Sequence, residues 1–206
     1  MKNKLLVIAG PNGSGKSTVT SELDLSDFHY VNADMIEKEL KNVIEGFSSL
    51  DAARNAEETL NKLLSHNENI AFETVLSTDR KIKFMKNAKA NGYSITCIYI
   101  LTHNPSVNVE RVKQRVKMGG HSVVEEKITT RYFRCLKLLP YIFNICDEVH
   151  VYDNSKDRNS GSPKRIISFV QGRFQIYPNE IWTVKKLESL LSGTYCENYL
   201  GHSYSI

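Results

Sequence analysis

Short apolar runs alternate with longer polar or amphipathic stretches over the first three quarters of the chain. The apolar runs are expected to be β-strands, and they cover residues 5–9, 28–31, 70–72, 93–102 and 148–152. Strands that alternate with helical stretches favour a parallel sheet of the doubly wound α/β type.

Two helices are predicted from the pattern between these strands. Residues 51–65 have apolar side chains at helical spacing and predict an amphipathic helix that ends before a polar stretch. A second helix is predicted over residues 79–90, because Asn91-Gly92 directly after it is a suitable C-terminal cap.

A third helix is expected to follow the fourth strand after a long polar segment. Ser122 and Glu125 have the spacing of a capping box, so this helix is predicted to begin there. It should run to about Leu139, ahead of Pro140.

The last quarter of the chain predicts a hairpin and a final helix. After a polar loop at residues 154–165, the apolar segments 167–170 and 174–177 flank Gln171-Gly172-Arg173. Two strands around such a short turn predict a β-hairpin. Residues 179–191 then predict a helix.

Length and composition indicate one domain. A chain of 206 residues with 41% hydrophobic composition can form one well-buried core and is short for two, so residues 1–206 are read as a single domain. The cysteines form no CxxC pair, which is typical of a reducing compartment. They are Cys97, Cys135, Cys146 and Cys196.

The N-terminal segment predicts no export signal. Lys2 and Lys4 precede only five apolar residues before Gly10, too few for the apolar core of a signal peptide. No other run approaches the length of a membrane span. We therefore expect a cytoplasmic protein with no membrane partner.

The strongest chemical signal is the segment GPNGSGKST at residues 10–18, directly after the first predicted strand. Glycines let the backbone curl so that its N–H groups point at phosphates, and the following helix N-terminus favours negative charge. Lys16 would reach the β- and γ-phosphates, and the Ser17 hydroxyl would ligate Mg²⁺. The alternative is a glycine-rich turn without a ligand. The predicted nucleotide-binding residues are Gly10, Pro11, Asn12, Gly13, Ser14, Gly15, Lys16, Ser17 and Thr18.

Polar residues follow three of the other predicted strands, where ligands of open parallel sheets bind. Asn32 and Asp34 follow the second strand, and Glu73 and Thr74 follow the third. Asp34 could be a general base for an acceptor hydroxyl, or it could form a capping box with Glu37.

Glu73 and the pair after the fifth strand have their own alternatives. Glu73 could hold Mg²⁺ through water or bind the acceptor, or it could be a strand-end charge that reaches solvent. Asp153 and Asn154 are typical turn residues, and we predict a structural role for them.

The charge of the chain is concentrated in one segment. The net charge of +4 is too small to indicate nucleic-acid binding, and we expect no nucleic-acid partner. Residues 111–137, however, hold eight lysines and arginines against two glutamates. Such a block can be a solvated helix face, or in a P-loop protein it can be a lid that closes over ATP.

Two arginine pairs in this segment suit a lid. Arg111 and Arg115 are one helical turn apart, Arg131 and Arg134 are three residues apart, and Gly119-Gly120 lies between the pairs. A lid over residues of about 105–139 would bring guanidinium groups to the transferring phosphoryl group, where one arginine can contribute a rate factor of roughly a thousand.

Taken together, these segments resemble the zeta toxin family of P-loop kinases, especially its short bacterial members. The matching motifs are GPNGSGKST, VNAD, FETVLS, RVKQRVKMGGHSVVEEKITTRYFR and YDNS, in order between residues 10 and 155. The resemblance implies a P-loop kinase-like fold with a helical lid, here followed by the C-terminal hairpin and helix. Two positions depart from the family: Val75 stands where a threonine is common, and Val124 where a proline is common.

The resemblance also implies an activity and a partner. Known relatives phosphorylate UDP-N-acetylglucosamine with ATP unless an antitoxin, here expected to be a small helical protein, covers the site. Asp34 matches the catalytic base, and Glu73 matches the acidic residue on the substrate and metal side. Arg115 and Arg131 best match the lid arginine that contacts the γ-phosphate.

We therefore expect an ATP- and Mg²⁺-dependent kinase of a small-molecule hydroxyl, most plausibly on a nucleotide sugar. The predicted catalytic residues are Lys16, Asp34, Arg115 and Arg131; Ser17 and Glu73 would hold the metal. The predicted acceptor-binding residues are Asn32, Asp34, Glu73, Thr74, Arg111 and Arg134. The alternatives are a kinase of another metabolite, a nucleoside or an RNA end, and an ATP-binding switch with little transfer activity.

Overall fold

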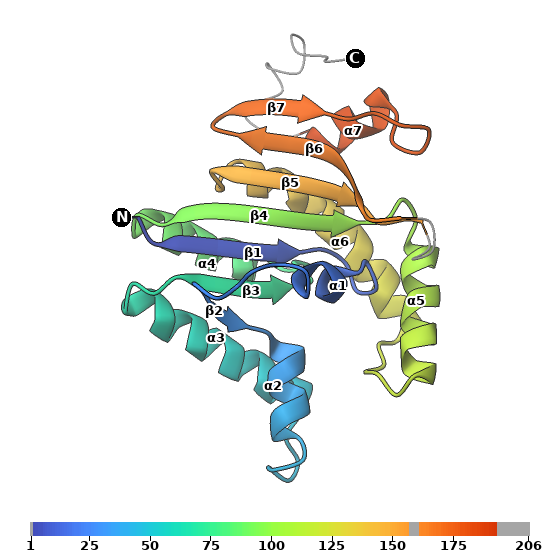
Figure 1. The fold of residues 1–206 in the computed structure, drawn as a ribbon. Coiled ribbons are helices and arrows are strands. Elements are labelled where there is room, and N and C mark those ends of the chain that lie inside the picture. The colour runs from blue at the N-terminus through green and yellow to red at the C-terminus, as the bar shows by residue number, and fades with distance from the viewer. Residues whose placement is uncertain (1, 157–160, 193–206) are drawn as a thin grey trace.

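A computed structural model describes residues 2–156 and 161–192, which form a seven-stranded sheet in the order β2-β3-β1-β4-β5-β6-β7 (Figure 1). The first five strands pair in parallel, and β6 and β7 add an antiparallel hairpin at one edge. The strands are β1 (Lys4–Ala9), β2 (His29–Val31), β3 (Ile70–Thr74), β4 (Ser94–Leu101), β5 (Glu148–Asp153), β6 (Lys164–Val170) and β7 (Arg173–Ile176).

Helices lie on both faces of this sheet. In Figure 1, α1 lies in front of the strands, whereas α3, α4 and α6 lie behind them. Connections between parallel strands are right-handed crossovers. Along the strand order the chain moves one way from β1 to β2 and the other way from β2 onward, so the helices before and after β2 lie on opposite faces of the sheet. The helices are α1 (Lys16–Thr20), α2 (Ala33–Leu40), α3 (Ser49–Ser65), α4 (Asp79–Ala90), α5 (Pro105–Lys117), α6 (Glu125–Phe143) and α7 (Val184–Leu191).

The register of the parallel strands brings their carboxyl ends to one edge of the sheet. Ala9, the last residue of β1, pairs with Thr74 of β3 and with Tyr99 of β4. Leu101 at the end of β4 pairs with Asp153 at the end of β5. The segments that follow β1, β3, β4 and β5 therefore meet at this edge.

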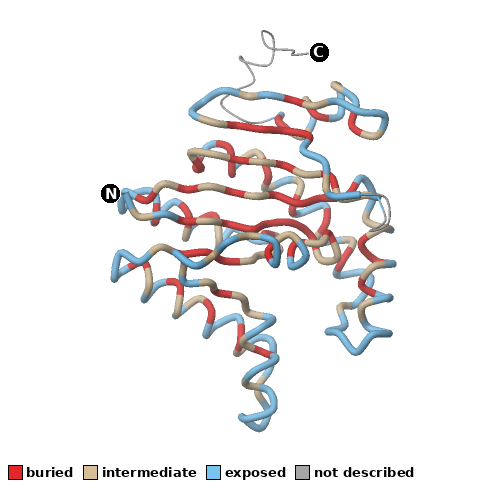
Figure 2. The backbone as a smooth tube through the Cα atoms, viewed as in Figure 1, coloured by how far each residue is buried: buried red, intermediate tan, exposed pale blue. Residues whose placement is uncertain are grey.

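The core is continuous between the sheet and the helices behind it. Strand residues such as Val7, Phe72, Ile95 and Val151 are buried and pack with apolar residues of α3, α4, α6 and α7. Figure 2 shows buried positions concentrated along the central strands and exposed positions on the loops after α2 and α5. A rigid sheet thus supports the loops at its carboxyl edge.

A second, small apolar cluster joins α5 to α6. Val109 and Val112 of α5 pack with Ile128 of α6, and Val123 of the connecting loop covers them. The two helices are therefore held together by contacts of their own, apart from the main core.

The structure closely confirms the predicted strands, the helix over residues 79–90 and the hairpin. The capping box at Ser122 is wrong: Val124 occupies the N-cap position of α6, and no side chain caps it. Pro140 lies inside α6 and does not end it. Pro140 lacks the N–H of an ordinary helix residue, and it lies in the last turn of α6, where the helix ends three residues later.

The final helix begins later than predicted, at Val184. The Asn179 side chain instead accepts hydrogen bonds from the Ile181 and Trp182 amides, which forms a turn ahead of the helix. Cys97, Cys135 and Cys146 are free and buried, while Cys196 lies outside the described residues. In the described part of the chain, every helix is too short or too polar to cross a lipid bilayer.

Candidate active site

The loop between β1 and α1 has a backbone path that needs glycine. Gly13 has a φ of 76°, and a Cβ there would lie 2.5 Å from the carbonyl oxygen of Asn108. Gly15 has a φ of 95°, and a Cβ there would lie 2.2 Å from Nδ2 of Asn154. A positive φ and such close neighbours exclude other residues. The loop is thus enclosed by residues from two other parts of the chain.

These two asparagines also hold the loop by hydrogen bonds. Asn108 on α5 donates from Nδ2 to the Asn12 carbonyl at 2.6 Å and accepts from the hydroxyl of Thr102. Asn154, directly after β5, donates from Nδ2 to the Ser14 carbonyl at 2.8 Å. Both side chains donate to loop carbonyls, so neither of them occupies a loop N–H group that could face a ligand.

Asn154 is therefore more than the turn residue that the sequence indicates, and Asn108 belongs to none of the sequence motifs. Their signal is positional: Asn108 follows β4, which lies beside β1, and Asn154 directly follows β5, the next strand along the sheet. Asp153, by contrast, is a turn residue as predicted, because its carboxylate accepts hydrogen bonds from Ser155.

Lys16 begins α1 and is buried. Its Nζ donates to the Pro11 carbonyl at 3.0 Å, so the ammonium group lies inside the curve of the loop. Burial lowers the pKa of Lys16, while the nearby carboxylates of Glu73 and Asp34 act in the opposite direction. Lys16 is thus placed in a buried site, where attraction between its ammonium group and a polyphosphate would be strong.

Glu73 at the end of β3 points at the loop and accepts hydrogen bonds from three hydroxyl groups. Ser17 Oγ lies 3.2 Å from Oε1 and 3.3 Å from Oε2, Thr20 Oγ1 lies 3.4 Å from Oε2, and Tyr30 Oη lies 3.3 Å from Oε2. The alternative of a strand-end charge that reaches solvent does not hold. Ser17 and Glu73, the two predicted metal ligands, are brought together.

Asn32 and Asp34 lie at the start of α2, and the Asp34 carboxylate is near enough to Lys16 to affect its pKa. The Asn32 side chain is the N-cap of α2 and accepts from the amides of Asp34 at 2.9 Å and Met35 at 3.4 Å. The capping role considered for Asp34 therefore belongs to Asn32. Asp34 sits in the first helical turn, where its carboxylate can act on a ligand.

Thr74 makes its hydrogen bonds to the phosphate-binding loop and to the segment that follows β3. Its carbonyl accepts from the Gly10 amide at 3.2 Å, and its hydroxyl accepts from the Leu76 amide at 3.1 Å. These contacts tie the end of β3 to the start of the phosphate-binding loop.

The four predicted lid arginines have different surroundings. Arg131 on α6 reaches the loop, with Nη1 3.4 Å from Asn12 Oδ1. Arg115 on α5 donates to the His121 carbonyl at 2.8 Å, and its positive charge is one of the smaller causes, after burial, of the lowered pKa of Lys16. Both therefore lie on the side of the phosphate-binding loop.

Arg111 and Arg134 lie farther from this point. Arg111 donates to the carbonyls of Asn154 and Lys156, each at 2.7 Å, and so helps to hold the segment after β5. Arg134 is exposed on α6. Arg131 thus contacts the loop directly, whereas Arg111 contacts the segment that follows β5.

The tip of the α5–α6 segment contacts the acceptor side of the cleft. Nδ1 of His121 lies 3.7 Å from Oε1 of Glu37, which is one turn beyond Asp34 on α2. The segment therefore bridges the cleft between the phosphate-binding loop and α2.

Comparison with known proteins agrees with this geometry. The family model described as Zeta toxin matches residues 1–160. An uncharacterized protein of Haemophilus influenzae is 32% identical over 132 residues, which cover 64% of this chain and 94% of that protein.

Solved structures share the fold at low sequence identity. The AvrRxo1-ORF1:AvrRxo1-ORF2 complex with sulphate ions has a TM-score of 0.71 at 14% identity and covers 92% of this chain and 71% of the other. The same complex is also known with ATP, at a TM-score of 0.67 and 15% identity, covering 93% and 64%. The PezAT toxin-antitoxin system of Streptococcus pneumoniae has a TM-score of 0.59 at 14% identity, covering 97% and 83%.

Proposed function

This chain belongs to the zeta toxin family, and we propose that it is an ATP-dependent kinase that transfers the γ-phosphate to a hydroxyl of a small molecule. The observation that carries the proposal is the convergence of Lys16, Ser17, Glu73 and Asp34 at one edge of the sheet. A phosphate-binding loop alone would serve any NTPase, whereas a carboxylate across the cleft suits an alcohol acceptor.

The loop residues 10–18 would hold the triphosphate of ATP. Their backbone N–H groups would face the phosphates, and Lys16 would neutralise charge on the β- and γ-phosphates. Ser17 and Glu73 offer a hydroxyl and a carboxylate, the oxygen ligands that Mg²⁺ prefers. They would hold Mg²⁺, directly or through water, and the ion when bound neutralises charge that develops on the phosphates.

Asp34 would take the proton of the acceptor hydroxyl. Its place in the first turn of α2 leaves the carboxylate accessible to the cleft, and the Asn32 cap fixes the helix that carries it. Arg131 and Arg115 would stabilise the charge on the phosphoryl group as it moves between donor and acceptor. Asn32, Glu73, Thr74, Arg111 and Arg134 stay predictions as acceptor contacts.

Residues of about 105–139 would act as a lid within a single-domain enzyme. The separate apolar cluster joins α5 to the start of α6, whereas Cys135 and Leu139 hold the rest of α6 in the main core. Closure would therefore involve α5 and the connecting loop, which already contacts Glu37. Closure of such a unit would exclude water from the transferring phosphoryl group.

For the acceptor we propose a nucleotide sugar, with UDP-N-acetylglucosamine as the first compound to test. Family membership supports this choice, together with an acceptor side that holds a carboxylate and exposed polar groups on α2. A small helical antitoxin is proposed as the protein partner. The support for it is that PezAT, which shares the fold, is a toxin-antitoxin system.

Asp34→Asn tests the kinase assignment. The variant should bind MgATP with wild-type affinity in calorimetry, yet lose transfer by a factor of roughly a hundred or more. Transfer is measured by phosphorus NMR with a panel of nucleotide sugars, nucleosides and RNA ends. Glu39→Gln, which neutralises an exposed carboxylate on the same helix, is the matched control.

The outcomes separate the rival functions. Equal transfer by wild type and Asp34→Asn would rule out Asp34 as the base. MgATP binding without any phosphorylated product in the panel would favour the ATP-binding switch. No uptake of MgATP by the wild type would refute the nucleotide site itself.

A further inference from the structure

Tyr30, the middle residue of β2, connects the two halves of the site. Its hydroxyl lies 3.3 Å from Oε2 of Glu73 on one side and 2.9 Å from Nδ2 of Asn32 on the other. Glu73 in turn contacts Ser17, and Asn32 caps the helix that carries Asp34. A continuous chain of hydrogen bonds thus runs from the proposed metal ligands to the proposed base.

We propose that Tyr30 is a positioning residue for phosphoryl transfer, which holds the Glu73 carboxylate against Ser17 and anchors the Asn32 amide that starts α2. This inference rests on the proposed function, because it assigns Tyr30 a role in the same reaction. Tyr30 would act through Glu73 and Asn32 and would not itself touch the reacting atoms.

The direction of each hydrogen bond in the chain is determined. Oδ1 of Asn32 accepts from the first amides of α2, so its NH₂ group must face Tyr30 and donate to it. The phenol oxygen then accepts from Asn32 and has one proton left to donate, which goes to the carboxylate of Glu73.

The position of Glu73 depends on hydroxyl donors. Tyr30 contacts only Oε2, on the β2 side of the carboxylate, whereas Ser17 contacts both oxygens from the loop side. If the Tyr30 hydroxyl is removed, Glu73 loses its anchor on the β2 side and can turn away from the loop. Asn32 loses at the same time the acceptor that fixes its amide.

Tyr30→Phe is the direct test, because it removes the hydroxyl and keeps the half-buried ring. We expect kcat to fall about tenfold and the Mg²⁺ concentration for half-maximal activity to rise, as is typical when a residue that orients a metal ligand is changed. KM for ATP at saturating Mg²⁺ should change by less than about twofold, because the loop contacts to the phosphates are untouched.

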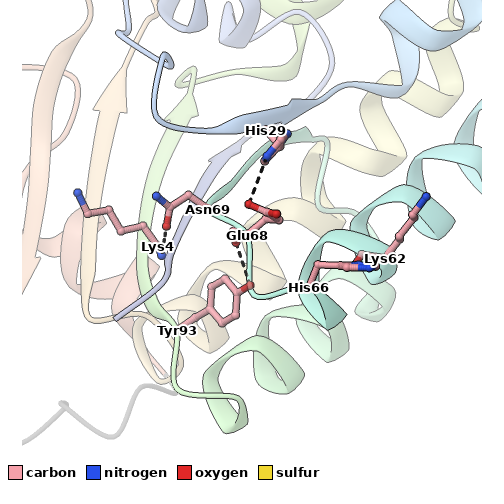
Figure 3. Close-up of polar contacts among 7 residues, drawn as sticks. All are labelled: Lys4, His29, Lys62, His66, Glu68, Asn69 and Tyr93. Atoms are coloured by element: carbon pink, nitrogen blue, oxygen red, sulfur yellow. Dashed lines mark hydrogen bonds and ion pairs between the residues drawn. The ribbon is translucent and has the colours of Figure 1, made fainter. Parts of the chain in front are cut away.

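Tyr93→Phe is the matched control. Tyr93 is more deeply buried than Tyr30, and its hydroxyl makes one hydrogen bond, to the Glu68 carbonyl at 2.9 Å (Figure 3). This contact lies just before the start of β3, whereas Glu73 lies near the carboxyl end of that strand. This variant should lose stability to a similar extent in thermal unfolding, with wild-type kcat and an unchanged Mg²⁺ midpoint.

A second variant protects the test against a general loss of structure. Asn32→Asp keeps a side-chain oxygen that can cap α2 but removes the NH₂ donor to Tyr30. Combined with Tyr30→Phe, it should lower kcat by less than the product of the two single effects, because both variants break the same chain.

Three results are distinguishable. A Tyr30→Phe variant with the kcat and Mg²⁺ midpoint of Tyr93→Phe would overturn the inference while the kinase proposal stands. The inference would also be overturned if the double variant lowered kcat by the full product of the effects of Tyr30→Phe and Asn32→Asp. A wild-type protein that neither binds MgATP nor transfers phosphate would instead refute the proposed function.

Discussion

Replacing Gly13 by alanine should weaken ATP binding by more than backbone strain alone would. Gly13 has a φ of 76°, and the Cβ of an alanine there would lie 2.5 Å from the Asn108 carbonyl oxygen and 3.1 Å from the carbonyl carbon. Ordinary contacts of a Cβ begin at 3.4 Å. The loop or the start of α5 would therefore have to move by roughly 0.9 Å, since both atoms of the collision are fixed to backbone.

The cost can be worked out from these contacts. A left-handed conformation costs an alanine roughly 1–2 kcal/mol. Moving the loop away from α5 would also break the hydrogen bond from Asn108 to the Asn12 carbonyl, which adds about 1 kcal/mol. If most of this free energy is lost from MgATP binding because the phosphate site is distorted, the Kd for MgATP should rise roughly thirtyfold to a hundredfold, at about 1.4 kcal/mol per factor of ten.

Gly46→Ala separates strain from collision. Gly46 has a φ of 75°, nearly that of Gly13, but nothing lies within 4 Å of the point where a Cβ would be added. Gly46→Ala should show its backbone cost of about 1–2 kcal/mol as a loss of stability in urea unfolding, with unchanged affinity for MgATP. Only Gly13→Ala should show the weaker MgATP binding in calorimetry. Wild-type affinity in Gly13→Ala would refute the reasoning, because the approach of the loop to α5 would then have no part in shaping the phosphate site.

Three further predictions concern the loop, the lid and the sheet. Asn154→Ala removes a hydrogen bond to the loop of about 1 kcal/mol and should weaken MgATP binding roughly fivefold; unchanged affinity in calorimetry would contradict its bracing role. Val124 has a φ of −59° that proline can adopt, so Val124→Pro should stabilise the protein by about 0.5–1 kcal/mol in urea unfolding, and a loss would show that the N-cap of α6 needs a residue other than proline. Burial raises the pKa of Asp147, but hydrogen bonds from Lys89 at 2.5 Å and from the Ile95 amide at 2.8 Å have the larger combined effect and hold this pKa below 3.8. The advantage in Tm of the wild type over Asp147→Asn should therefore be present above pH 3.8 and disappear as the pH falls below it; an advantage that persists into stronger acid would show that the carboxylate charge is not its source.

Local features are predictable from the sequence because their causes are local. The helix at residues 79–90 is predicted with its bounds, since Asn91-Gly92 ends it by backbone conformation alone. The hairpin is predictable because only two residues, Gln171 and Gly172, connect β6 to β7, and both adopt a positive φ. The spacing Ser122 to Glu125 fails because α6 begins at Glu125, so Val124 is the N-cap and Ser122 lies two residues ahead of it, which spacing does not report.

The site could be predicted only for residues that belong to a contiguous motif or follow a strand directly. Lys16 and Ser17 are in the loop motif, and Glu73 ends a strand beside it. Tyr30 has no such signal because it lies within a strand, where an aromatic residue is ordinary. Its role depends on β2 pairing with β3, which brings the phenol to Glu73.

The order of the strands is what converts separate motifs into one site. β4 lies beside β1, and β5 lies beside β4, so the segments after both strands reach the same loop from one side. Asn108 and Asn154 approach from that side, whereas β3 brings Glu73 from the other. Helical spacing alone gives both members of an arginine pair the same expectation. In the structure Arg131 contacts Asn12 of the loop, whereas Arg134 is exposed. The tertiary arrangement, and not the spacing, therefore decides which of the basic residues can act on a phosphate.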